Sequence, residues 1–380
     1  MSSTEFSSMP LELNSSSVPN TTVSTICIND FVEPPATPLE LWQNWYQPIH
    51  GYAAPIVCIF GVVANTLNFV VLTSKNMQSP TNVILSGLAV SDGLTMAAYF
   101  PYVILNYHVY ISKPSPHSNA SFLMFYAIVS VIVHSISIWL TVALALFRYI
   151  FIRYPRRGTK LCTVYRAKLT IFIVSVVTAV VCIPNCVIYT LEKYVEPHSN
   201  ETSWFINVKE TTSTEIFVKN LNFWTQALLV KLLPCFMLSI LSICLVNTMK
   251  DAEKRRKKLL NKTNKVKGED ETRRHRKTNR TTRMLLTVVV LFLVTETPQG
   301  ILQLLSGIID GFFNDVYHPL GDLMDILALI NNGINFALYC TMSKQFRDTF
   351  IRIFLKDVLR SGDKRGTALV ATQATKDTDV

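Results

Sequence analysis

The sequence predicts an all-α membrane protein, a seven-transmembrane helix bundle with a short amphipathic interfacial helix after the seventh span. Of its 380 residues, 49% are hydrophobic and only 16% are charged, a composition typical of membrane proteins. Seven apolar stretches each supply the roughly 20 residues that a helix needs to cross a bilayer. They cover residues 51–74, 83–107, 121–147, 168–191, 221–247, 284–309 and 320–341.

The basic residues predict how the spans are oriented. No Lys or Arg precedes Lys75, whereas residues 250–283 are dense in both. Because Lys and Arg are retained on the cytoplasmic side, we expect an extracellular N-terminus, a cytoplasmic C-terminus and a location in the plasma membrane. The odd number of spans agrees with both ends. The net charge of +10 therefore reflects topology and contact with anionic lipid, and no nucleic-acid partner is expected.

The chain divides into four predicted parts. Residues 1–49 form an extracellular disordered tail, 50–342 the bundle, 343–358 the interfacial helix and 359–380 a cytoplasmic tail. The first part is rich in Ser, Thr, Asn and Pro and lacks the apolar core of a signal peptide. Phe346, Phe350 and Phe354 recur every four residues, which predicts one apolar stripe on the interfacial helix. Glycosylation sequons on the predicted outside begin at Asn14, Asn20, Asn119 and Asn200.

The eight cysteines do not predict a disulfide framework. Only Cys27 lies clearly in an outer segment, and residues 192–220 contain no cysteine. Other contacts must then hold the second outer loop, or Cys27 pairs with Cys186 near the outer end of the fourth span.

Polar residues recur at one characteristic place in each of several spans. They are Asn65 in the first, Leu88-Ala-x-x-Asp92 in the second, Phe147-Arg148-Tyr149 at the end of the third, Pro298 in the sixth and Asn335-Phe-Ala-Leu-Tyr339 in the seventh. Over residues 50–356 this pattern resembles the rhodopsin-like (class A) G-protein-coupled receptors. Three departures stand out: Phe147 replaces an acid, Glu296 replaces a Trp, and Phe336 replaces a Pro. Phe-Arg-Tyr, Thr-Glu-Thr-Pro and Asn-Phe-Ala-Leu-Tyr together are similar to the invertebrate myosuppressin and FMRFamide-like peptide receptor group.

A buried polar layer is expected midway along the bundle. Its members are hard oxygen or amide groups around one carboxylate: Asn65, Asp92, Ser137, Asn331 and Asn335. The resemblance implies the sodium site of class A receptors, and a plain hydrogen-bond network is the alternative. A sodium ion is the only cofactor expected.

A second set of polar residues lies nearer the outside and predicts the ligand site. It contains Tyr102, His134, Lys231, Glu296, Gln299, Gln303, Asp322 and Asp325. A buried charge is costly unless it is paired or neutralised, so Glu296 has two readings. It either pairs with Lys231 or awaits a guanidinium of the ligand. The outer segments carry many more acids than bases, which favours a cationic ligand.

The resemblance implies that Arg148, Tyr149, Pro298 and Tyr339 serve activation and coupling to a heterotrimeric G protein. Phe147 cannot form the acid–arginine lock of the family, so another partner restrains Arg148 or basal activity is raised. Arrestin and a receptor kinase are further partners that the resemblance implies.

The sequence thus predicts a receptor for a cationic, C-terminally amidated neuropeptide of the RFamide type. No catalytic pattern is present, so an enzyme is not expected. Two alternatives stay open: a seven-helix receptor for a small chemical, and a transporter or channel that uses Asp92, Lys231 and Glu296. Residues 123–139 lack the acid that an amine receptor needs, and residues 320–341 lack the lysine that a light receptor needs.

Overall fold

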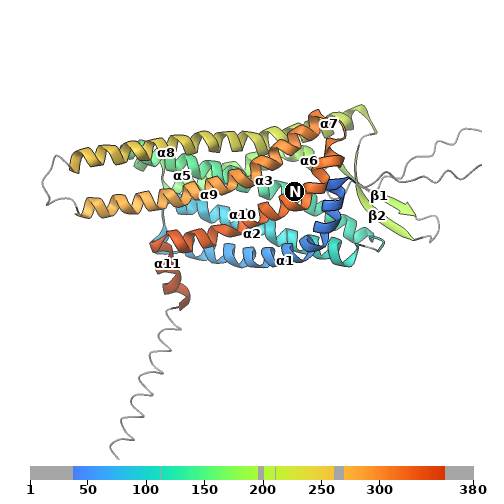
Figure 1. Ribbon diagram of the computed structural model, residues 1–380, viewed down its shortest axis with the longest axis horizontal. Helices are drawn as coiled ribbons and strands as arrows, with labels where there is room; N and C mark the ends of the chain where they lie inside the picture. Colours follow the sequence, from blue (N-terminus) through green and yellow to red (C-terminus); the bar gives the residue numbers. More distant parts are fainter. Residues whose placement is uncertain (1–36, 112, 196–200, 210, 261–268, 356–380) are drawn as a thin grey trace, which may run out of the picture.

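The computed structural model describes residues 37–111, 113–195, 201–209, 211–260 and 269–355, and Figure 1 shows them as long helices lying side by side. Seven helical segments are long and apolar enough to span a membrane. Their bounds are Pro38–Thr73, Pro80–Val109, His117–Arg153, Val164–Val181, Ser213–Asp251, Leu286–Ile308 and Phe313–Met342. The predicted seven-helix bundle is confirmed.

The two ends of the bundle differ. A two-stranded antiparallel hairpin, β1 (Tyr189–Val195) and β2 (Thr202–Val208), extends from one end. The short helix α11 (Lys344–Phe350) lies at the opposite end (Figure 1). We call these the hairpin end and the α11 end. The hairpin was not predicted, and its first strand takes residues 189–191 from the expected fourth span.

Helix α1 (Pro38–Thr73) starts well before the expected boundary. Thr37 and Glu40 form a capping box, with Pro38 in the first turn. Both features stabilise a helix start, and the Trp42 and Tyr46 rings stack 5.4 Å apart on the first turns. The prediction that residues 38–49 belong to a disordered tail is therefore wrong. Residues 1–36 and 356–380 lie outside the described chain, as does most of each predicted tail.

The next elements run from α2 to α6. They are η1 (Lys75–Met77), α2 (Pro80–Ile104), the π-helical turn η2 (Leu105–Val109), α3 (His117–Arg153), α4 (Pro155–Leu161), α5 (Val164–Val181) and α6 (Ile183–Val187). Helix α3 is longer than its predicted span at both ends. Helix α5 is the shortest span, and Cys182 separates it from α6.

The second half of the bundle contains two long composite helices. Helix α7 (Ser213–Trp224) continues through the π-helix η3 (Thr225–Leu232) into α8 (Leu233–Leu260). Helix α9 (Glu269–Ile308) contains Pro298. The π-helix η4 (Phe313–Tyr317) leads into α10 (His318–Met342), and η5 (Ile351–Leu355) follows α11. Single π-helical turns often mark functional sites, and η3 carries the buried Lys231.

Helix α10 runs unbroken through Phe336, the residue in place of the family's Pro. The Phe336 ring packs edge-on against Phe346 of α11, with centroids 6.0 Å apart, and against Phe350 at 5.7 Å. Phe346 is 1% exposed, whereas Phe354 is 38% exposed. The apolar stripe of the interfacial helix therefore begins inside the bundle and ends at its surface.

Candidate functional site

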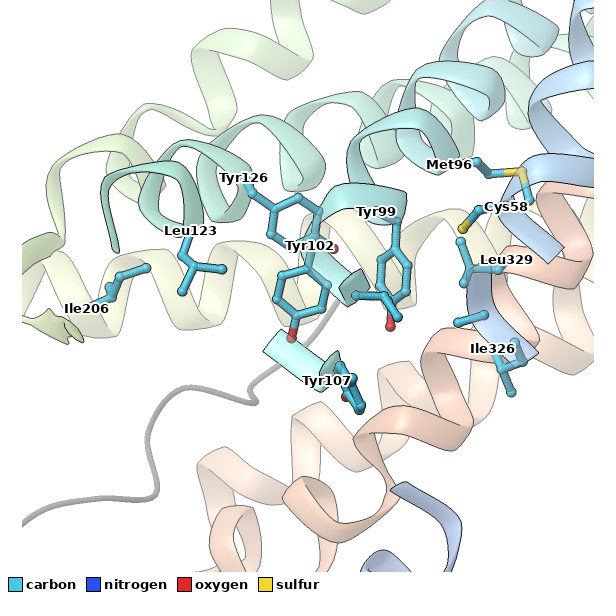
Figure 2. Packing of buried hydrophobic residues seen from close by; sticks show 12 residues of the cluster. Cys58, Met96, Tyr99, Tyr102, Tyr107, Leu123, Tyr126, Ile206, Ile326 and Leu329 are labelled. Carbon is cyan, nitrogen blue, oxygen red and sulfur yellow. The ribbon is translucent and has the colours of Figure 1, made fainter. Parts of the chain in front are cut away.

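A cluster of tyrosines and aspartates lies near the hairpin end, between α1, α2, α3 and α10. We call Tyr99, Tyr102, Tyr107, Tyr126, Asp322 and Asp325 the tyrosine–aspartate cluster. All six residues are buried, and Figure 2 shows the four tyrosine rings gathered at one level. The Tyr102 and Tyr126 rings stack with centroids 4.4 Å apart. Ile206 of β2 belongs to the same apolar cluster, so the hairpin covers it.

Each aspartate of this cluster accepts a hydrogen bond from a tyrosine. Tyr107 donates to Asp322 Oδ1 at 2.5 Å, and Tyr99 donates to Asp325 Oδ2 at 3.1 Å. The His50 Nε2 atom lies 2.9 Å from the Tyr99 hydroxyl and can donate to it. Two carboxylates one turn apart, each with a fixed hydroxyl donor, form a strongly acidic site suited to a guanidinium or ammonium group.

The sequence reading found only half of this cluster. Tyr102, Asp322 and Asp325 were predicted as ligand residues, whereas Tyr99, Tyr107 and Tyr126 were not. Tyr99 could have been predicted from its spacing, because it lies one helical turn before Tyr102 and therefore shares a face with it. Among the other predicted ligand residues, Gln303 is only half-buried.

A second polar cluster joins three spans deeper in the bundle. Lys231 of η3 donates to Glu296 Oε2 of α9 at 2.6 Å and to Gln299 Oε1 at 2.8 Å. The His134 Nε2 atom of α3 lies 3.1 Å from the Lys231 ammonium and 3.3 Å from the carboxylate. Lys231 is 7% exposed and Glu296 is 0% exposed. Of the two readings open for Glu296, the structure supports the pair with Lys231.

The middle layer gathers around Asp92. Ser137 donates to Asp92 Oδ1 at 2.5 Å, and Asn335 Nδ2 donates to Oδ2 at 3.1 Å. Asn65 Nδ2 instead donates to the main-chain oxygen of Asn332 at 3.0 Å. Asn332 is buried, whereas Asn331 is only half-buried, so the structure turns the neighbour of the predicted residue into the bundle.

This layer retains unused hydrogen-bonding capacity in the part of the chain that the structure describes. The oxygen atoms Asn65 Oδ1, Thr95 Oγ1 and Asn335 Oδ1 are buried without a hydrogen-bond partner. Buried polar atoms are normally satisfied, so water or a small cation would suit these acceptors. The donor set, one carboxylate with amide and hydroxyl oxygens, fits a hard monovalent or divalent cation.

At the α11 end, Phe147 packs against an apolar cluster that includes Leu140, Tyr339 and Phe346. Arg148 is half-buried, and its Nε atom has no hydrogen-bond partner among the described residues. Tyr149 beside it is half-buried as well. Phe147 thus contributes apolar packing at the place where the family has an acid.

Of the predicted glycosylation sites, only Asn119 lies within the described residues, and it is buried. Asn119 lies in the first turn of α3, is 5% exposed, and donates through Nδ2 to Ser115 Oγ at 3.0 Å. A glycan attached to this nitrogen would remove that contact and need space that the fold occupies, so the structure disfavours modification there. Asn14, Asn20 and Asn200 lie outside the described residues, as does Cys27; the described cysteines are free thiols.

Comparison with known proteins decides the family. The serpentine type seven-transmembrane GPCR chemoreceptor family Srw matches residues 52–357. The chain belongs to this family of G-protein-coupled receptors. The receptor is 30% identical to the G-protein coupled receptor dmsr-1 of Caenorhabditis elegans, over 83% of this chain and 70% of that protein. It is also 30% identical to the sex peptide receptor of Drosophila melanogaster, over 86% of this chain and 76% of that protein.

A more distant relative is the FMRFamide receptor of Drosophila melanogaster, which is 22% identical over 84% of this chain and 55% of that protein. These matches confirm the predicted class A-like GPCR and the resemblance to receptors of the FMRFamide group. The receptor is thus a multi-pass membrane protein of a signalling family, and that family is not one of enzymes. These matches are to receptors and give no support to the alternative of a transporter or channel.

Proposed function

We propose that the receptor binds a cationic, C-terminally amidated peptide at the hairpin end and transmits binding to a heterotrimeric G protein at the α11 end. The tyrosine–aspartate cluster is the observation that carries this proposal. It offers two buried carboxylates to a ligand cation, in a chain whose relatives include receptors named for sex peptide and FMRFamide. The positive-inside rule supports placing the hairpin end outside the plasma membrane, since the basic end of α8 and the basic start of α9 lie at the α11 end (Figure 1).

The peptide's basic side chain binds Asp322 and Asp325 in this proposal, and Glu296 is not its anchor. Glu296 already receives the Lys231 ammonium at 2.6 Å. Asp322 accepts a hydrogen bond from the Tyr107 hydroxyl and Asp325 accepts one from the Tyr99 hydroxyl. A guanidinium can add a bidentate charged contact beside such donors, and the stacked Tyr102 and Tyr126 rings provide faces for an aromatic side chain of the ligand.

The experiment is a screen of amidated peptides against cells that express the receptor and a G-protein reporter. An active Arg-containing peptide is then compared with its citrulline analogue on native, Asp322→Asn and Asp325→Asn receptors. We expect the native receptor to prefer the Arg peptide by about tenfold or more, since a charged hydrogen bond contributes roughly 1.5–3 kcal/mol. At least one Asn variant should lose that preference at normal surface expression. If both variants retain it, the aspartates do not read the charge.

We further propose a sodium ion in the middle layer. Asp92 would hold it together with the unpartnered oxygens of Asn65, Thr95 and Asn335, and Ser137 would contribute its hydroxyl. A bound ion would supply positive charge that offsets the Asp92 carboxylate in the dry interior. Ser137 and Asn335 already orient that carboxylate through hydrogen bonds to its two oxygens.

A further inference from the structure

We propose that the buried Lys231–Glu296 pair is the latch that holds α9 in the resting state, and that signalling requires this pair to open. This role rests on the proposed function, because a contact that restrains α9 affects signalling only if the receptor changes conformation when its ligand binds. We use the word latch for four side chains: His134, Lys231, Glu296 and Gln299.

The latch ties together three spans at one point. His134 comes from α3, Lys231 from η3, and both Glu296 and Gln299 from α9. The Lys231 ammonium lies within 2.6 to 3.1 Å of an atom from each of the other three side chains. An ammonium has three N–H donors, and each of these atoms can accept one when the His134 proton is on Nδ1. The lysine is therefore fully engaged, and a displacement of α9 away from η3 would break two of its three contacts.

Opening the latch inside the bundle would move both charges toward apolar neighbours. Toward the α11 end, the described residues that pack between the same three spans include Ile138, Val142, Ala145, Cys235, Leu238, Val289 and Phe292. Breaking a buried ion pair strands each charge in a medium of low dielectric constant, which is strongly unfavourable. The pair therefore favours the closed arrangement of α9 unless water or a ligand reaches it from the hairpin end.

The backbone around the latch is built for close contact and for bending. Pro298 lies two residues beyond Glu296 and removes one main-chain donor from α9. Gly300 lets α9 approach η3 closely, because a Cβ atom there would stand 3.3 Å from Lys231 Cβ. Lys231 itself lies in the last turn of the π-helix η3. The ion pair thus bridges a proline hinge and an irregular helical turn, which are the two places where these spans can change shape.

The latch also connects to the helix that carries the ligand aspartates. Tyr317, at the start of the seventh span, is buried, and its side chain lies near that of Gln299. Asp322 and Asp325 follow on α10 within the same continuous segment. A peptide that pulls on these aspartates would move Tyr317 and, through Gln299, one of the three contacts of Lys231. This is a contiguous chain of contacts with one charged pair whose opening both ends can bias.

The test uses the full receptor without any ligand. Glu296→Gln and Lys231→Gln each remove one charge, and the reciprocal exchange Lys231→Glu with Glu296→Lys restores a pair. Lys193→Gln on the exposed strand β1 is the control for loss of a lysine. We expect each single variant to raise ligand-free G-protein signalling per surface receptor by about tenfold, a shift of about 1.4 kcal/mol. The exchange should return signalling toward the native level, and Lys193→Gln should not change it.

A second readout needs neither a G protein nor a ligand. Spin labels at Leu161 of α4 and Val290 of α9, both exposed, report the distance between these helices in purified receptor, with Cys27 and Cys186 replaced by Ser. The single variants should populate a longer distance that the native receptor and the exchange lack. The conservative Glu296→Asp shortens one side chain and serves where a Gln variant folds poorly.

Two results would overturn the latch. Native signalling and native distances in single variants that reach the surface would show that the pair does not restrain α9. Poor expression of the single variants, rescued by the exchange but with native distances throughout, would make the pair structural only. A peptide screen without an agonist would instead remove the proposed ligand and leave the distance measurements interpretable, so the two proposals fail separately.

Discussion

The Tyr107 hydroxyl donates a 2.5 Å hydrogen bond to the Asp322 carboxylate, and this contact positions one of the two acids of the tyrosine–aspartate cluster. Tyr107 lies in the π-helical turn η2, and Asp322 lies on the first turns of α10. The bond therefore joins the second and seventh spans near the hairpin end.

Tyr107→Phe removes this donor and keeps the ring. We expect potency of an Arg peptide to fall by about tenfold, because losing one hydrogen bond to a buried carboxylate costs roughly 1–3 kcal/mol. The preference for Arg over citrulline should persist, since both carboxylates remain. Tyr52→Phe, on a ring that is 70% exposed, is the matched control. Loss of the preference itself would show that Tyr107, and not Asp322, recognises the charge.

Gly61→Ala tests the closest packing between α1, α2 and α10. A Cβ atom at Gly61 would overlap the end of the Met96 side chain and lie 3.7 Å from Gly333 Cα. Met96 is fully buried, so its thioether has little room to move, and overpacking costs roughly 1–3 kcal/mol. We expect a lower midpoint of thermal unfolding in detergent. Combining the change with Met96→Val should recover part of the loss; no recovery would place the strain at Gly333.

Much of the middle layer follows from the sequence alone. Asp92, Ser137 and Asn335 were expected together and do share hydrogen bonds, because helical periodicity and span depth suffice to align residues on long apolar helices. Asn332 was missed because Asn331 and Asn332 lie four and three residues before Asn335. Both spacings place a residue near the face of Asn335, so helical periodicity does not separate them.

Other features depend on information that single-sequence patterns lack. The start of α1 could have been predicted, since Thr37, Pro38 and Glu40 form a capping box signature. The π-helices η2, η3 and η4 could not, because an extra residue per turn is stabilised by neighbouring helices and leaves no local signal. The hairpin was not predicted from the loop sequence, since an isolated pair of strands is marginally stable and this one is stabilised by contacts with the bundle, such as the packing of Ile206.

The sodium proposal predicts an effect of Asp92→Asn. Affinity of the native receptor for its agonist should fall when sodium replaces a bulky cation at constant ionic strength, and Asp92→Asn should abolish that difference. Ser86→Ala is the control, because its hydroxyl bonds within its own helix, to the Val83 oxygen at 2.7 Å. Agonist affinity that is already indifferent to sodium in the native receptor would rule the ion out.

Phe147→Asp restores the acid of the family beside Arg148. We expect lower basal signalling, since a carboxylate can pair with the adjacent guanidinium, together with lower thermal stability, since Phe147 leaves its apolar cluster. Phe147→Leu removes most of the ring without adding charge and separates the two effects. If Leu and Asp lower basal signalling equally, packing and not the missing acid governs Arg148.

The last prediction concerns how the hairpin is held in place. Class A receptors generally fasten the second outer loop to the third helix by a disulfide, whereas the described cysteines here are free thiols. The structure shows three other contacts: the Trp204 N–H donates to the Ser115 oxygen at 2.8 Å, the Ser115 N–H donates to Ser203 Oγ at 3.1 Å, and the Trp204 ring meets His117 edge-on at 4.7 Å.

These contacts lie at the start of α3 and would hold the hairpin against this helix in place of a disulfide. Mild reductant should therefore leave agonist potency nearly unchanged, whereas Trp204→Ala should lower it. Trp204→Ala removes the ring contact with His117, so we expect faster amide hydrogen exchange across β2. The main-chain hydrogen bond from residue 204 to Ser115 remains, so the hairpin should not detach completely. Tyr194→Ala, on the exposed part of β1, provides the control for loss of an aromatic ring. A large potency loss in reductant would instead show that Cys27 is bridged, with Cys186 as the partner nearest the hairpin end.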